Sequence, residues 1–145
     1  MKKQLIIVLI LLIVLRLIIV LYINNANKIE KLTQTHNEKY EQYYNKQIIG
    51  ATLISIINET INYNENIGIT KVDNYYIDNN QNSIHITIKF LEDDRIIKME
   101  DIAKGETENF VKFFSVANFK CTEIKYHQNT NKVKSLHFEQ ISNWF

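Results

Sequence analysis

The stretch that most constrains this chain is LIIVLILLIVLRLIIVLYI, residues 5–23, in which Arg16 is the only charged side chain. At a rise of 1.5 Å per residue, a helix of this length covers about 28 Å, close to the ~30 Å hydrocarbon core of a bilayer. A helix buried in a small soluble domain needs only one apolar face, whereas this stretch is apolar on every side. The sequence therefore predicts a transmembrane anchor over residues 1–25, with membrane lipid as its surroundings.

A cleaved signal peptide is the alternative for this stretch. Such peptides have an apolar region of about 7–15 residues and end in small residues, but here the apolar run is longer and leads into Asn24 and Asn25. We therefore expect it to be retained. Lys2 and Lys3 in the short stub before it predict a cytoplasmic amino terminus, with the carboxyl-terminal domain outside.

Arg16 has two interpretations. Its long stem can carry the guanidinium group most of the way to the headgroups, about 10 Å from the end of the span. Alternatively it pairs with an acidic residue in the transmembrane helix of a partner, because a charge inside the bilayer is costly and often marks a contact.

The remaining residues are enough for one ordinary domain. The chain has 17 basic and 16 acidic side chains and a net charge of +1, and these charges are interleaved, so a nucleic-acid partner is not expected. With one cysteine, Cys121, no internal disulfide can form.

Residues 26–45 predict a helical stalk, because apolar and aromatic side chains recur on one helical stripe. We expect this helix to continue that of the span; the alternative is a helix restart at Thr35 and Glu38, whose spacing matches a capping box. The members of the stripe are Ile29, Leu32, His36, Tyr40 and Tyr43.

Residues 46–145 predict a small α+β domain. A helix over 45–62 is expected to pack on a four- or five-stranded antiparallel meander, with a short helix inserted at GETENFVKFFS, residues 105–115. The alternation of SIHITIKF, residues 83–90, is typical of a strand with one buried face. When the strand registers are chosen so that apolar residues face each other, the predicted pairs are Ile77 with Ile84, Phe90 with Ile97, Ile88 with Met99, Ile124 with Leu136, and Thr122 with Phe138.

Chemistry-bearing residues are few. The predicted registers leave no more than two possible metal ligands at any one place among His85, His127, His137, Cys121, Glu123 and Glu139, so neither a metal nor a cofactor is expected. Glu92, Asp93 and Asp94 fall in a hairpin turn. Nucleophile-elbow, phosphate-loop and zinc-protease motifs are absent from the sequence, which indicates that the protein is not an enzyme.

Several residues are candidate partner contacts, because tyrosine and tryptophan are enriched where protein surfaces meet; packing within the core is the alternative for the tyrosines. They are Tyr40 and Tyr43 on the stalk and the terminal pair Trp144 and Phe145, together with Arg16 in the span.

Two resemblances accompany these patterns. The segments NNQNSIHITIKF and FKCTEIKYHQNTNKVKSLHFEQI, behind a single amino-terminal span, resemble small uncharacterised single-pass membrane proteins of AT-rich Gram-positive bacteria, a resemblance that implies no activity. The layout is also similar to that of type IV pilins, but that family has a glycine before the apolar run and a glutamate at its fifth position. Here the first glycine is Gly50 and the first acid is Glu30.

These features predict a membrane-anchored interaction or structural domain outside the membrane, with a protein partner, in the setting of an envelope or secretion assembly. One alternative is a sensory head that binds a small molecule between helix 46–62 and the sheet. A pilin-like subunit is another.

Overall fold

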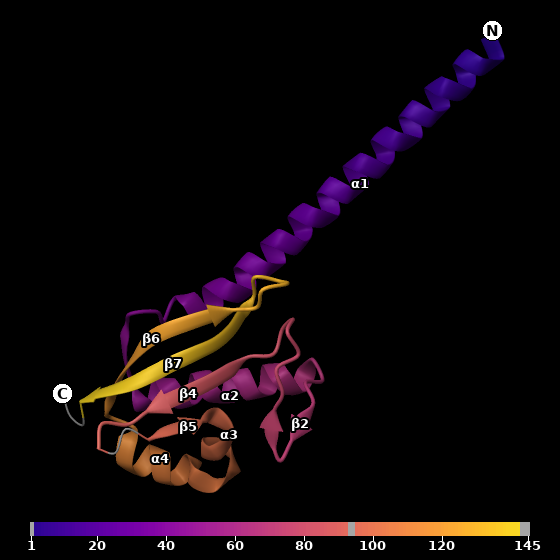
Figure 1. The fold of residues 1–145 in the computed structure, drawn as a ribbon. Coiled ribbons are helices and arrows are strands. Elements are labelled where there is room, and N and C mark those ends of the chain that lie inside the picture. The colour runs from indigo at the N-terminus through magenta and orange to yellow at the C-terminus, as the bar shows by residue number, and fades with distance from the viewer. Residues whose placement is uncertain (1, 93–94, 143–145) are drawn as a thin grey trace. The chain divides into compact units, whose positions relative to one another are not determined.

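The computed structural model describes residues 2–92 and 95–142, with Glu106 and Thr107 described by their backbone alone (Figure 1). The chain divides into two compact units, Met1–Thr35 and His36–Phe145. Helix α1, Lys2–Glu41, begins in the first unit and ends in the second. We call the second unit the head.

In the first unit, α1 exposes its apolar side chains all round, and those between Leu5 and Ile23 are 46–75% exposed. By length and composition this helix could cross a membrane, and either an anchor or a signal sequence fits that description. The helix runs through Thr35 without a break, which confirms a stalk continuous with the apolar stretch and shows that the alternative, a restart at Thr35 and Glu38, is wrong. A capping-box pattern decides a helix start only where the preceding residues leave the helix.

The head is α+β, as predicted, and its main sheet has five strands in the order β1-β6-β7-β4-β5. The pair β4–β7 is parallel and the others are antiparallel, so the sheet is mixed and the predicted antiparallel meander is wrong. The five strands are β1 Gln47–Ile49, β4 His85–Lys89, β5 Ile96–Lys98, β6 Asn118–Tyr126 and β7 Val133–Ser142; a separate pair is β2 Lys71–Val72 with β3 Tyr75–Tyr76.

Helix α2, Gly50–Asn66, contributes the residues that pack against the sheet, with Leu53 and Ile57 completely buried. The predicted helix over 45–62 begins too early, because residues 47–49 are extended and pair with β6. Gly50 is required at the helix start, since a Cβ atom there would lie 1.9 Å from the carbonyl oxygen of Phe114.

The predicted alternation in residues 83–90 is confirmed, with the apolar side chains buried beside those of β7. The buried residues of this segment are Ile84, Ile86, Ile88 and Phe90, and those of β7 beside them are Leu136 and Phe138. The expected pairing of Ile77 with Ile84 is wrong, because β3 pairs with β2 and β7 occupies that side of β4. The longer β7 brings more apolar side chains to β4 than the short β3 can.

The hairpin between β4 and β5 forms, but Ile88 lies opposite Ile97 rather than Met99. A shift of two residues keeps the same side chains on the buried face, so hydrophobic matching cannot distinguish the two registers. Met99 instead begins helix α3, Met99–Asp101, where it is fully buried. The segment Ile102–Glu106 then contains a kink at Gly105, whose φ is 146°, and leads into α4, Thr107–Phe114, which confirms the predicted short helix.

The hairpin of β6 and β7 pairs Ile124 with Leu136 as predicted. A bulge between Cys121 and Glu123 places Cys121 rather than Thr122 opposite Phe138. The bulged strand carries an extra residue, which a straight count of apolar matches cannot detect.

Candidate functional site

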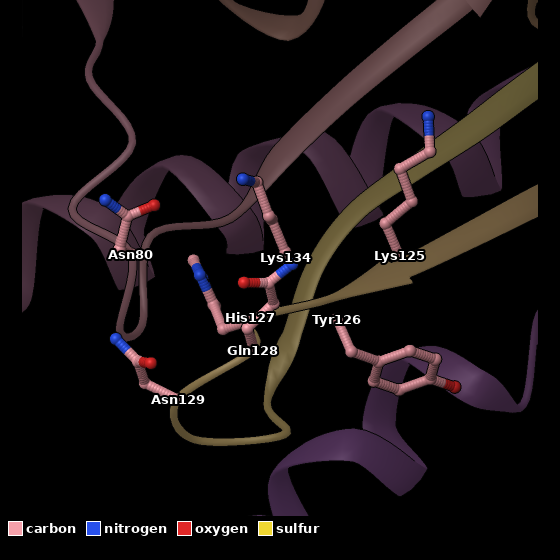
Figure 2. Close-up of a pocket in the computed structure, with 7 residues that line it drawn as sticks. All are labelled: Asn80, Lys125, Tyr126, His127, Gln128, Asn129 and Lys134. Carbon is pink, nitrogen blue, oxygen red and sulfur yellow. The ribbon is translucent and has the colours of Figure 1, made fainter.

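A polar pocket of about 630 Å³ lies in the head where β6 ends and β7 begins (Figure 2). Its walls come from this hairpin and from the loop of residues 78–83 that precedes β4. The lining residues are Asn80, Lys125, Tyr126, His127, Gln128, Asn129 and Lys134.

The hairpin turn that forms one wall is closed by backbone hydrogen bonds. The amide of His127 donates to the carbonyl of Lys132 at 2.9 Å, and the amide of Asn131 donates back to the carbonyl of His127 at 2.9 Å. Asn131 has a φ of 54°, a left-handed conformation that asparagine tolerates better than most residues. The QNTN sequence therefore suits this turn.

The loop of residues 78–83 is organised by the side chain of Asn79. Its Oδ1 accepts hydrogen bonds from three successive backbone amides, those of Gln81, Asn82 and Ser83, at 2.9–3.1 Å. Asp78 Oδ1 accepts the amide of Asn80 at 2.8 Å. Asparagine and aspartate form such local bonds readily, which explains why DNNQNS adopts a fixed loop here.

His127 forms the floor between the two walls and is 2% exposed. Its Nε2 lies 2.8 Å from the carbonyl oxygen of Ser83, and because a carbonyl can only accept, Nε2 carries the proton. Nδ1 has no hydrogen-bond partner among the described residues and lies 3.8 Å from Asp78 Oδ1.

The charged groups at the pocket are paired. Lys134 contacts Asp78 Oδ2, and Lys125 Nζ lies 3.0 Å from Glu123 Oε2. Burial acts to raise the pKa of Asp78, but the hydrogen bond from Lys134 and that from the backbone of Asn80 outweigh it and hold this pKa below its ordinary value. The pocket is therefore close to neutral overall.

The last turn of α1 is bonded to the same hairpin. Asn37 Nδ2 donates to the carbonyl of Asn131 at 2.8 Å, and the amide of Val133 donates to Asn37 Oδ1 at 2.9 Å. Tyr126, which lines the pocket, donates its hydroxyl to Glu41 at 2.8 Å. The end of α1 and the pocket wall thus form one hydrogen-bonded unit within the head.

His36 lies beside this connection, with its ring 5.5 Å from that of Tyr40 and 5.1 Å from that of Tyr63. Burial, assisted by the nearby charges of Lys132 and Lys39, lowers the pKa of His36 to about 4. The imidazole is therefore neutral at physiological pH.

The candidate partner contacts occupy different environments. Tyr40 is 1% exposed and belongs to the core, so its ring is not available to a partner on the surface of the folded head. Tyr43 is half-buried against the same core, and Arg16 lies on the apolar part of α1 in the first unit. Trp144 and Phe145 lie outside the described residues.

The residues considered for metal chemistry do not converge. Among residues 2–92 and 95–142, no three histidine, cysteine or acidic side chains are arranged to hold a metal ion. His137 Nδ1 lies 2.8 Å from the hydroxyl of Thr87. Burial raises the pKa of Cys121 to about 11, and its thiol donates to the carbonyl of Glu123 at 3.6 Å, so this sulfur is a poor nucleophile at neutral pH. Asp93 and Asp94 lie outside the described residues.

Sequence reasoning missed the pocket. The asparagine-rich composition of NNQN, residues 79–82, and of QNTNK, residues 128–132, was the one available signal. The pairing of Asp78 with Lys134 and His127 joins residues about 50 positions apart, which periodicity cannot reveal. Comparisons with protein-family models, curated proteins and solved structures found no match to this chain.

Proposed function

We propose that this protein is a membrane-anchored interaction domain, with residues 5–23 in the bilayer, the amino terminus in the cytoplasm and the head outside. The observation that carries the proposal is the exposure of apolar side chains on every side of α1 between Leu5 and Ile23. Leaving a large apolar side chain in water costs roughly 1.5–3 kcal/mol. A bilayer removes that cost along the whole stretch.

The head supports a binding role because its core is closed while its polar pocket is open. Leu53 and Ile57 are fully buried between α2 and the sheet, where the alternative hypothesis of a sensory head placed a small molecule. The pocket at the β6–β7 turn is therefore the better location for a ligand. A sensory head that binds at this pocket is our second proposal, favoured by the hydrogen bonds of Asn37 to the pocket wall.

Arg16 has a role in either proposal. It reaches toward the headgroups or pairs with an acid in a partner's transmembrane helix. The variant Arg16→Leu separates these roles, because only the second predicts loss of a co-purifying membrane protein, whereas Leu17→Ala serves as a control on the same helix.

The proposal is tested by expressing the full chain in bacteria and washing the membranes with alkaline carbonate. We expect intact protein to stay with the membrane, and a protease added outside spheroplasts to digest the head. Protein that begins at Asn24 or later and purifies without detergent would show a cleaved signal peptide and overturn the anchor. Protection of the head from the protease would instead overturn the orientation.

A further inference from the structure

We propose that the pocket at the β6–β7 turn binds a hydroxyl-rich ligand of saccharide chemistry. The inference deepens the proposed binding role of the head and rests on it. It starts from three primary amides, those of Asn80, Gln128 and Asn129, which line one pocket. The described part of the chain offers their side chains no hydrogen-bond partner, so each keeps two donors and an acceptor for a ligand.

Neighbouring hydroxyl groups on a sugar ring both donate and accept, and side-chain amides match that combination better than a carboxylate or an ammonium group alone. Figure 2 shows Asn80 on one loop and Asn129 on another, with Lys134 between the loop and the hairpin. A ligand in this pocket meets amide groups from two sides.

The charges at the pocket disfavour a strongly ionic ligand. Lys134 is paired with Asp78, and Lys125 with Glu123, so an anion would have to compete with a carboxylate for each ammonium group. Free phosphate and a sugar differ in this respect, since the sugar needs hydrogen bonds but no unpaired charge.

A peptide or lipid partner is disfavoured by the absence of apolar anchoring sites. None of the seven lining residues is aliphatic, and of the two aromatic rings that of His127 is 2% exposed and already hydrogen-bonded, while that of Tyr126 is 44% exposed. Protein interfaces draw most of their affinity from buried aromatic and aliphatic anchors. An aromatic ring beside amides provides both an apolar surface for ring C–H groups and a hydrogen-bonding edge.

The pocket is organised before any ligand arrives. Thr130 donates its hydroxyl to the carbonyl of Gln81 at 2.5 Å, and His127 donates Nε2–H to the carbonyl of Ser83 at 2.8 Å. These bonds hold the two walls together, so ligand binding does not include the free-energy cost of ordering them.

The test uses the full chain, labelled with ¹⁵N, in a zwitterionic detergent that carries no sugar. The probes are tetrasaccharides of glucose and of N-acetylglucosamine, with tetra-alanine and inorganic phosphate for comparison. We expect at least one tetrasaccharide to shift the amide signals of residues 126–131 saturably, and the double variant Asn80→Ala with Asn129→Ala to weaken that binding at least about tenfold.

Asn62→Ala is the matched control, because it removes an exposed amide from α2, away from the pocket. Saturable shifts by tetra-alanine or phosphate without a saccharide response, no response to any probe, or equal weakening by Asn62→Ala would each overturn the inference. Because binding in detergent is independent of topology, a failed membrane anchor with intact saccharide binding would contradict only the anchor.

Discussion

Two helices of this chain are built from the same apolar residues and differ in what surrounds them. In α1, the side chains between Leu5 and Ile23 are 46–75% exposed, whereas in α2 Leu53 and Ile57 are fully buried. The apolar residues of α2 recur on one face and pack within the head, while those of α1 cover the whole circumference. The number of apolar faces, rather than the count of apolar residues, distinguishes a helix suited to lipid from one suited to a protein core.

The most direct test of this difference is to introduce charged side chains into the apolar part of α1. We expect Leu11→Lys combined with Val14→Lys to move the protein out of the membrane fraction, since each lysine near the middle of a span costs ~2.5–3.5 kcal/mol and the pair about 5–7 kcal/mol. Fractionation followed by immunoblotting measures the shift. Asn27→Lys with Thr33→Lys is the control, and equal membrane retention in both variants would show that 5–23 is not held by lipid.

The same substitution in both helices sharpens the contrast. Leu53→Ala should lower the free energy of unfolding of the head by about 2–5 kcal/mol, because it leaves a cavity in a packed core. Leu12→Ala, at a side chain 57% exposed, should change it by less than about 0.5 kcal/mol. Urea unfolding, monitored by hydrogen exchange at β4, measures both, and comparable losses would contradict the separation of the two regions.

Two asparagines allow the same comparison of buried and more exposed sites for polar side chains. Asn64 is buried in α2, donates to the carbonyl of Ile84 at 2.7 Å and accepts its amide at 3.0 Å, whereas Asn37 makes the equivalent pair of bonds at a more exposed site. Asn64→Ala leaves two buried backbone groups without partners and should cost about 2–4 kcal/mol. Asn37→Ala should cost less, about 1–2 kcal/mol, because water can reach the carbonyl of the exposed Asn131 and only the amide of Val133 is left buried without its partner. Urea unfolding of the two variants provides the test, and a larger loss for Asn37→Ala would reverse our assignment of burial.

The smallest effect concerns pH. Burial lowers the pKa of His36 to about 4 and also lowers that of His85. As pH falls from 6.5 to 4 the unfolded chain takes up protons that the folded head does not, so the free energy of unfolding must decrease. Melting temperatures of wild type and His36→Gln between pH 7 and 4 should therefore converge as the pH falls, and parallel curves would contradict a neutral, buried His36.

Local periodicity was sufficient for several elements of the head. The alternation of residues 83–90, the short helix with Phe110, and the pairing of Ile124 with Leu136 were all predictable, because each depends on neighbours along the chain or on a single tight hairpin. The parallel pairing of β4 with β7 was not predictable, because it joins His85 to Ser135 across two helices and a hairpin. The bulge near Thr122 was not predictable either, because a bulge leaves no periodic signal in the sequence.

The candidate site shows the same division. The asparagine-rich residues 79–82 and 128–132 are typical of turns, but the sequence contained no sign that the two segments meet at His127. Tyr40 was a candidate partner contact and lies in the core, where His36 of the same helix packs against its ring. Spacing placed Tyr40 on one stripe with His36 and Tyr43, but it could not tell whether that stripe packs within the chain or against a partner.

By itself, the sequence determined that residues 5–23 form a helix apolar on all sides, because that property depends on composition over a continuous stretch. It also determined the α+β class of the head, through two distinct hydrophobic periods. Only the tertiary structure decided the order of the strands, the register at Ile88 and the polar pocket. Each of these depends on the free energy of contacts between distant segments, and several arrangements bury the same apolar residues almost equally well.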